Sequence, residues 1–463
     1  MKESETTWAS KVLFFLLCVT VVFTALAYGT VHQPTIAVFY ILAVVTILLW
    51  ATDAFLSGAV RYNQSLLQIP LMATILYGII QIIPFGSLAE TAGVAGISRT
   101  LSLDPFWTKI ATIHFFALLI FFAAFLVFFD SAKRLRTMVT LITIFGFAFA
   151  FFAILQAVLS PNKIYGIYEV PYASPFGSFV NRHNFAAYME MTLCLPLGLI
   201  FVGAVDKDRR LLYVTAIALM GIALILSGSR GGLVSLVAAI FFLIILTTKT
   251  KSSGQLALKI GLAALLISTI IVGSVLIGGE SSLTRFAETA NSQDFSTSRT
   301  HIWNVTLQII TNNLPFGTGL GAFGVAYTSL DSLDGLARVE QAHNDYLEVL
   351  ANAGIVGLII GLFFIYRLFR TGLENAKTTD TFRRGVCVGA LTGCFAVLVH
   401  SLFDFVLHTT AITVLFLTLV SLVVASGNKF SDDVQESAPR RRSRKTPSAS
   451  VTPIEKGRQS RKD

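Results

Sequence analysis

The chain is divided by long apolar runs, and their length restricts what it can fold into. Runs of about 17 to 25 residues with few charges recur along most of the sequence. Each is long enough to cross the ~30 Å hydrocarbon layer of a bilayer as a helix, which satisfies its own backbone hydrogen bonds. The sequence therefore predicts an all-α polytopic membrane protein with about twelve spans, at 11–29, 34–51, 66–84, 110–129, 137–159, 185–203, 211–227, 231–248, 256–278, 346–367, 385–405 and 409–426.

Composition agrees with this class. Hydrophobic residues make up 54% of the chain and charged residues only 13%, which excludes an ordinary soluble domain. The first run has no small-residue cleavage pattern and a second run follows at once, so we expect it to be retained rather than removed as a signal peptide. All four cysteines fall within predicted spans, which favours apolar packing over metal ligation or disulfide bonds: Cys18, Cys194, Cys387 and Cys394.

Lysines and arginines set the expected orientation. With both chain ends in the cytoplasm, all but eight of the 35 lysines and arginines lie on the inner side, as the positive-inside rule requires. This bias and a basic tail account for the net charge of +9, so nucleic acid is not an expected partner. We expect residues 1–427 to form the transmembrane domain and 428–463 to be a disordered cytoplasmic tail that touches membrane lipid.

One long polar segment interrupts the apolar runs. Residues 279–345 form a predicted outer, periplasmic loop between the ninth and tenth spans, and loops of this length are often functional. Six of the eight outer bases are arginines, whose planar guanidinium suits phosphate or carboxylate. We therefore expect the outer face to hold an anion. The eight bases are Arg99, Lys109, Lys163, Arg182, Arg230, Arg285, Arg299 and Arg338.

Two of these arginines stand at short outer junctions. Asn181 or Asn184 is expected to cap a helix whose N-terminal end, carrying Arg182, favours an anion. Interface anchoring is the alternative for Arg182 and the preferred interpretation of His183. Arg230 lies in a Ser-Gly-Ser-Arg-Gly-Gly turn, where exposed amides beside an arginine favour phosphate over a simple re-entry turn.

The large loop carries the remaining candidates. Arg299 is followed by Trp303 at helical spacing, and the glycine-rich turn at 315–323 is expected to bring Arg299 back toward His343. That turn lacks the strand–helix context of a nucleotide loop. His343 is expected to act either as a general base or as a structural residue, a helix cap or an interface anchor with Asn344.

Other polar residues near these positions have secondary roles. His301 is a second candidate base, and Asn344 and Asp345 are secondary site candidates. Glu340, Asp345 or Glu348 is expected to orient the imidazole of His343. His400 and Asp404, four residues apart, are expected to pair with each other as a structural tie, with a glycan contact as the alternative.

Five motifs in a fixed order carry a family resemblance. They are Gly-Ser-Phe with Asn-x-x-Asn-Phe-Ala at 177–186, the Ser-Gly-Ser-Arg-Gly-Gly turn, Arg299-x-x-x-Trp303, the turn at 315–323 and Ala-His-Asn-Asp-Tyr-Leu at 342–347. In this order they resemble the O-antigen ligase and polymerase superfamily of bacterial membrane glycosyltransferases. That superfamily also includes pilin and protein O-oligosaccharyltransferases.

The resemblance implies a reaction. It implies transfer of a glycan from an undecaprenyl-pyrophosphate carrier to an acceptor hydroxyl at the outer face of the bacterial inner membrane, without a metal or other cofactor. The acceptor would be a glycan, lipid A core or a protein. It also implies functional roles for Arg230, Arg299 and His343. On physical grounds, guanidinium groups would hold the pyrophosphate and an imidazole would accept the hydroxyl proton.

A different class of protein remains as an alternative. A twelve-span secondary transporter or polysaccharide exporter would also be apolar throughout. Such proteins usually carry ionisable groups at mid-membrane and two similar halves. Here the ionisable residues cluster at the outer boundary and one large loop breaks the symmetry, which favours the enzyme.

Overall fold

The computed structural model describes most of the chain. The described residues are 6–87, 96, 98–171, 173–248, 260, 261, 264, 268, 297–332 and 338–428. Most of the predicted ninth span at 256–278, Arg285 and nearly all of the predicted tail lie outside these ranges, as do parts of the predicted large loop. The expectations for those segments stay predictions.

The all-α prediction is confirmed for the described ranges. Nine helices there are long and apolar enough to cross a membrane: α1 (Trp8–Leu26), α2 (Gln33–Ser57), α4 (Pro105–Phe128), α5 (Ala132–Leu159), α6 (Arg182–Val202), α7 (Lys207–Leu226), α8 (Arg230–Thr247), α12 (Asp345–Asn375) and α13 (Thr381–His400). Two apolar helices are shorter: α3 (Gln68–Ile82) and α14 (Thr410–Ala425). These eleven helices overlap the predicted spans in order. The count of twelve is not tested.

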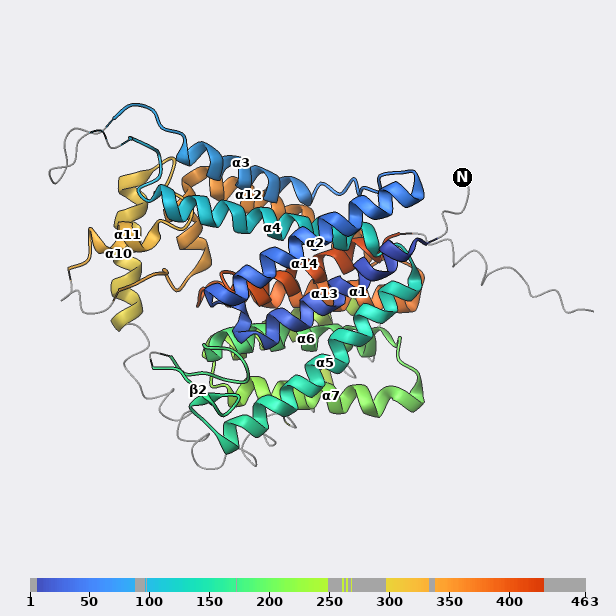
Figure 1. The fold of residues 1–463 in the computed structure, drawn as a ribbon. Coiled ribbons are helices and arrows are strands. Elements are labelled where there is room, and N and C mark those ends of the chain that lie inside the picture. Colours follow the sequence, from blue (N-terminus) through green and yellow to red (C-terminus); the bar gives the residue numbers. More distant parts are fainter. Residues whose placement is uncertain are drawn as a thin grey trace, which may run out of the picture.

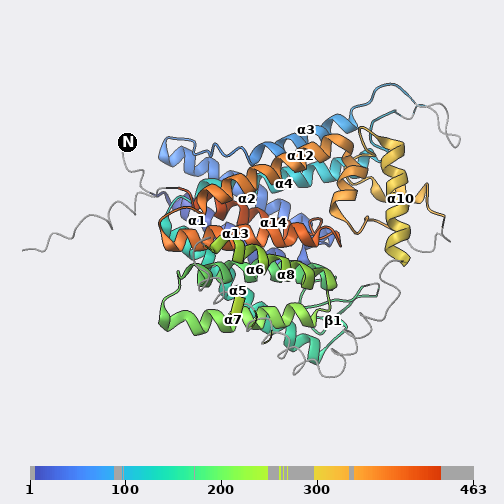
Figure 2. The same cartoon turned by 180° about the vertical axis from the view of Figure 1, so that it is seen from behind.

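The other elements are short or lie outside the bundle. They are the 3₁₀ turn η1 (Tyr28–Thr30), strands β1 (Lys163–Ile164) and β2 (Tyr168–Glu169), and helices α10 (Thr297–Asn313) and α11 (Phe323–Thr328). The two strands pair antiparallel, with Lys163 opposite Glu169. Figures 1 and 2 show the long helices side by side and α10 crossing one end of the bundle, opposite the end where α1 begins. We call these two ends the α10 end and the α1 end.

Polar residues start several helices where the apolar runs begin. The side chains of Asp104, Ser131 and Asp380 each accept a backbone N–H from the first turn of the helix that follows, α4, α5 and α13 respectively. Such caps satisfy amides that have no partner inside the helix.

The centre of the bundle is a close contact between α6 and α13. Every residue of α6 from Asn184 to Leu199 is buried. A Cβ added at Gly198 would lie 2.4 Å from the Cα of Gly389, so only glycines permit this approach. Small residues replace hydrophobic driving force as the basis of helix packing in lipid. The contact fixes α6 and α13 relative to each other. The start of α6 and the end of α13 carry site residues.

Helix α12 is broken near the α10 end. Gly354 has φ 59° and ψ −149°, which interrupts the helical hydrogen bonds. The glycine-rich turn fills the gap: the amides of Thr318 and Gly319 donate to the carbonyls of Ala351 and Asn352 at 2.8 and 2.9 Å, and Ile355 N donates to Pro315 O at 2.9 Å. A helix broken inside a membrane protein needs such replacement partners. The prediction that 315–323 is a backbone turn is confirmed.

Candidate functional site

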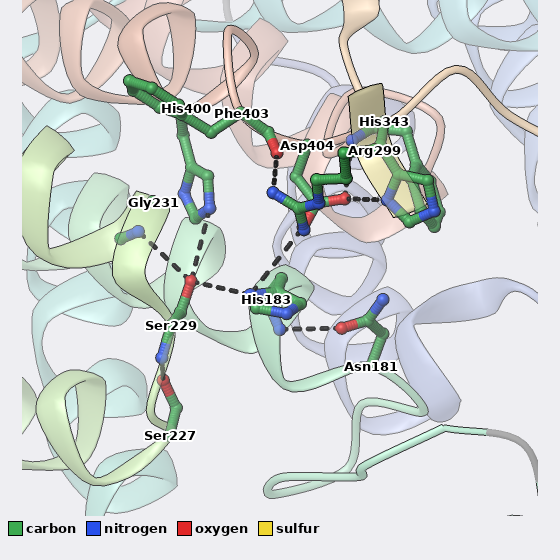
Figure 3. Close-up of polar contacts among 12 residues, drawn as sticks. Asn181, His183, Ser227, Ser229, Gly231, Arg299, His343, His400, Phe403 and Asp404 are labelled. Carbon is green, nitrogen blue, oxygen red and sulfur yellow. Dashed lines mark hydrogen bonds and ion pairs between the residues drawn. The ribbon is translucent and has the colours of Figure 1, made fainter. Parts of the chain in front are cut away.

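Asp404 lies at the centre of a charged cluster at the α10 end of the bundle. It sits in the loop after α13, and its side chain is 3% exposed. Its Oδ1 accepts a hydrogen bond from Nδ1 of His343 at 3.0 Å, and its Oδ2 accepts one from Nη2 of Arg299 at 3.3 Å (Figure 3). The predicted approach of Arg299 to His343 therefore occurs through a shared carboxylate.

The contact with Asp404 defines the chemistry available to His343. A carboxylate accepts but does not donate, so Nδ1 carries the proton and the neutral ring keeps its lone pair on Nε2. The ring also packs edge-on against Phe405, with centroids 4.8 Å apart. The side chain is 31% exposed. An oriented imidazole with a lone pair on Nε2 at a partly exposed position is suited to accept a proton.

Asp404 stays ionised in this setting. Burial disfavours the charged carboxylate, but the hydrogen bond from His343 and the charges of His183 and Arg299 outweigh that effect. Together they hold the pKa of Asp404 well below its ordinary value. The carboxylate is therefore available to orient His343 and Arg299 at any working pH.

Arg299 is fixed on one side of its guanidinium. Besides the contact with Asp404, its Nη1 donates to the backbone carbonyl of Phe403 at 2.6 Å. Arg299 lies in the first turn of α10, so the crossing helix delivers it to the end of the bundle (Figure 1). A guanidinium has five N–H groups, and these two contacts leave donors for an anion.

Two further helices begin beside Asp404. Helix α6 starts at Arg182, capped by Asn181, whose side chain accepts the amide of His183 at 2.9 Å. Helix α8 starts at Arg230, capped by Ser229. The Nδ1 of His183 lies 3.0 Å from the hydroxyl of Ser229 and 3.7 Å from Oδ2 of Asp404, which joins both helix starts to the cluster.

The Ser-Gly-Ser-Arg-Gly-Gly turn has a specific structural basis. A Cβ added at Gly228 would lie 3.5 Å from Nη1 of Arg182, so the guanidinium of Arg182 lies beside this turn. A Cβ added at Gly231 would lie 2.9 Å from the ring of His400, which therefore requires glycine to reach the first turn of α8. The hydroxyl of Ser229 lies 3.5 Å from Nε2 of His400.

The structure corrects two expectations about carboxylates. His400 and Asp404 do not pair with each other: His400 Nδ1 contacts both carboxylate oxygens of Glu190 at 3.2 Å, while Asp404 contacts His343 and Arg299. The reason is that α13 ends at His400, so the two residues do not share a helix face. The carboxylate that orients His343 is also Asp404 rather than one of the three predicted residues.

Those three residues have other partners. Asp345 Oδ1 and Glu348 Oε1 hold the two ring nitrogens of His408, each at 3.0 Å. Glu340 pairs with Arg338 at the surface. Asn344, not His343, caps α12, with its side chain accepting the amides of Tyr346 and Leu347. The cap interpretation of His343 is therefore wrong.

The predicted site residues fall into two groups: those on segments that meet around Asp404, and His301. Arg182, Arg230, Arg299 and His343 all lie on segments that meet around Asp404. His301 lies on α10 but pairs with Asp331 at 2.9 Å, away from Asp404.

The sequence alone does not assign four residues of this cluster their observed contacts. It predicts a pair of Asp404 with His400 and an interface anchor at His183, and it does not single out Ser229 or Glu190. The one available signal was Glu190 itself, a carboxylate inside an apolar run, since ionisable residues within spans are usually functional or paired. Among the described residues, no group of three or more His, Cys, Asp or Glu side chains is arranged to hold a metal ion.

The fold and the cluster define a class of protein. It is a polytopic helical membrane protein that gathers arginine, histidine and aspartate at one end of its bundle. A family model described as O-Antigen ligase matches residues 215–362, a segment that includes Arg230, Arg299 and His343. The resemblance to the O-antigen ligase and polymerase superfamily is thereby confirmed over these residues, and it supports a membrane glycosyltransferase of that general type. None of the curated proteins compared with the chain matches it.

Proposed function

We propose that the protein transfers a glycan from an undecaprenyl-pyrophosphate carrier to an acceptor hydroxyl, without a metal ion. The site would face the periplasm at the outer face of a bacterial inner membrane, with both chain ends in the cytoplasm. The acceptor would be a growing glycan or lipid A core, and a protein acceptor is the second candidate. The excess of lysine and arginine in the predicted inner loops supports this orientation.

One observation carries the proposal. Three helices, α6, α8 and α10, each begin near Asp404 with an arginine in the first turn: Arg182, Arg230 and Arg299. The N-terminal end of a helix is the positive end of its dipole, which favours an anion. Guanidinium groups add planar donors that match phosphate oxygens. This concentration of positive groups suits the diphosphate of a lipid-linked donor.

The reaction can be written with these residues. Nε2 of His343 accepts the proton of the acceptor hydroxyl as its oxygen attacks the anomeric carbon of the donor glycan. The new glycosidic bond forms while the bond from the anomeric carbon to the phosphate oxygen breaks. The electron pair of that bond leaves with the lipid diphosphate, and the arginines stabilise the added charge. Asp404 stabilises the imidazolium and holds the ring in place.

The transporter alternative has less support. The buried pair of Glu190 and His400 is the kind of intramembrane ionisable group that transporters use. Contacts through Ser229 and His183 connect this pair to the cluster around Asp404, which makes it part of the proposed active site.

The test uses purified protein, an undecaprenyl-diphosphate-linked glycan and a chelator. We expect transfer to persist with the chelator. His343→Ala should lower turnover by about 10²- to 10⁴-fold, the usual range for loss of a general base, with donor binding largely retained. His343→Asn is the sharper variant, because asparagine tolerates the φ of +50° at this position and its amide can still donate to Asp404. It supplies no base and should be as inactive as His343→Ala.

The arginines are tested beside the base. Arg299→Lys should recover little of the activity lost in Arg299→Ala, because an ammonium cannot contact Asp404, Phe403 O and a phosphate with one planar group. Full activity of both His343→Asn and Arg299→Lys, or loss of all activity with the chelator, would contradict the proposal.

A further inference from the structure

His343 has an unusual backbone conformation. Its φ is +50°, in the left-handed region that residues other than glycine and asparagine rarely adopt. Such a conformation persists only where the surrounding structure holds it, and it is concentrated at functional sites. The contacts that hold this residue should therefore lie on both sides of it.

The peptide groups of Ala342, directly before His343, are held from two directions. The indole N–H of Trp303 donates to the carbonyl of Ala342 at 3.1 Å. On the other side, Oε2 of Glu348 accepts the amide of Ala342 at 2.9 Å. Ala342 is fully buried and Glu348 is 3% exposed, so water does not replace these partners. Together the two contacts hold both the carbonyl and the amide of Ala342.

Glu348 is itself held in place. Its second oxygen accepts from His408, whose other ring nitrogen contacts Asp345 at 3.0 Å. The side chain of His408 is 39% exposed, and the charge of Glu348 and the hydrogen bonds to both carboxylates raise its pKa well above the ordinary value. The carboxylate of Glu348 is thus pinned between a cation and the Ala342 amide.

The spacing of the Arg-x-x-x-Trp motif follows from this geometry. Arg299 and Trp303 are four residues apart on α10, so their side chains leave the same face of the helix. Arg299 contacts Asp404, which orients the ring of His343, and Trp303 contacts the peptide that sets its backbone. One helix therefore positions both the carboxylate and the backbone of the same histidine.

We propose that Trp303 and Glu348 are positioning residues that hold the left-handed backbone of His343 through the two peptide groups of Ala342. The proposal rests on the proposed function, since it gives His343 a catalytic task. It assigns Trp303 no contact with either substrate. Trp303 would affect the reaction only by positioning Nε2 of His343.

Trp303→Phe is the principal test, because it keeps an aromatic ring and removes only the N–H donor. We expect turnover to fall about tenfold, the effect of one hydrogen bond, with the donor KM unchanged. In a His343→Ala background the same change should cost nothing more, because a residue that acts through His343 has no effect once the imidazole is gone. The control is Trp107→Phe, on the partly exposed first turn of α4, which should match the parent.

A second pair of variants keeps the test valid if Trp303→Phe accumulates poorly. Glu348→Gln retains an oxygen for the Ala342 amide, and its N–H₂ can donate to Nε2 of His408 once that ring is neutral with its proton on the Nδ1 that faces Asp345, so we expect activity within about twofold of the parent. Glu348→Met removes both contacts and should lower turnover without raising the donor KM. Glu340→Gln is the control, because the side chain of Glu340 is exposed and pairs with Arg338 at the surface.

The outcomes separate the two proposals. Equal losses from Trp303→Phe in the parent and in the His343→Ala background, or a loss expressed only in KM, would overturn the positioning role. Full activity of both single variants, Trp303→Phe and Glu348→Met, would also overturn the positioning role. If His343→Ala alone kept full activity, the general base of the proposed function would fail instead.

Discussion

At the scale of the residue, the cluster depends on how one buried carboxylate is shared. Asp404 lies within 3.0 to 3.7 Å of His343, Arg299 and His183, three groups that are or can become positive. An unpaired carboxylate at this depth would be costly, and removing one partner would leave it partly uncompensated. The partners and the carboxylate therefore hold one another in position.

Asp404→Asn tests this arrangement. The amide is nearly isosteric but carries no charge. Its N–H₂ can donate to Nδ1 of His343, which would place the ring proton on Nε2 and remove the lone pair that accepts the hydroxyl proton. We expect turnover to fall by about 10²- to 10⁴-fold while the protein still accumulates, as for loss of the orienting carboxylate in other imidazole–carboxylate pairs. Initial rates with a lipid-linked donor would measure it. Near-parental rates would mean that the carboxylate is dispensable for the chemistry.

The same carboxylate predicts a pH dependence of stability. Because the pKa of Asp404 is lower in the folded protein than in the unfolded chain, its contribution is complete above the unfolded pKa of about 4 and is lost as pH falls further. We expect the unfolding temperature of the parent in detergent to drop below about pH 4. In Asp404→Asn this drop should be smaller. An identical drop in both proteins would remove Asp404 as its source.

At the scale of the element, the broken helix α12 places the site. Its first half begins beside Asp404, with Asp345 N donating to Ser401 O at 3.0 Å. The turn at 315–319 packs into the break at Gly354. The side-chain amide of Gln81 on α3 donates to the carbonyls of Asn352 and Phe316 at 3.1 and 3.3 Å. The direction of the first half of α12, and hence the place of His343, depends on this break.

Two glycines of α12 form a matched pair of variants. A Cβ added at Gly354 would lie 2.1 Å from Pro315 O, whereas one added at Gly361 meets nothing within 4 Å. We expect Gly354→Ala to reduce folded protein and activity severely. Gly361→Ala should be neutral or stabilising by up to about 1 kcal/mol. Thermal unfolding and rates of both purified variants would check this. Equal behaviour of the two variants would show that the break is not required.

At the scale of the whole molecule, the bundle separates two kinds of polar cluster. At the α1 end, Arg61 and Arg134 both contact Asp130, at 3.2 and 3.0 Å, and tie helices together. At the α10 end, Asp404 contacts Arg299, His343 and His183. Figures 1 and 2 place α10 at the opposite end from the start of α1, so the two clusters would lie on opposite sides of a membrane.

Cysteine labelling tests which side is which. Single cysteines replace Ser332, at the α10 end, and Thr379, in the loop between α12 and α13, in a background without the four native cysteines. We expect an impermeant reagent added to intact cells to label the first site, and the second only after lysis, because the predicted inner loops hold most of the lysine and arginine. The reverse pattern would overturn the proposed periplasmic site.

The sequence by itself determined the class of fold and most of the site segments. Apolar runs of spanning length leave a chain few choices in lipid, and arginines on a base-poor side are conspicuous. For these reasons the helices could be predicted, as could an asparagine cap at Asn181 or Asn184, of which the structure has Asn181, and the candidates Arg182, Arg230, Arg299 and His343.

Tertiary structure alone decided which groups act on one another. Helix α13 ends at His400, one turn earlier than the apolar run suggests, so Asp404 turns to His343 and His400 turns to Glu190, 210 residues away in the chain. Local periodicity describes faces of one helix, whereas hydrogen bonds between helices depend on where each helix stops and how closely it packs. That is the physical reason why the candidate residues could be predicted and their partners could not.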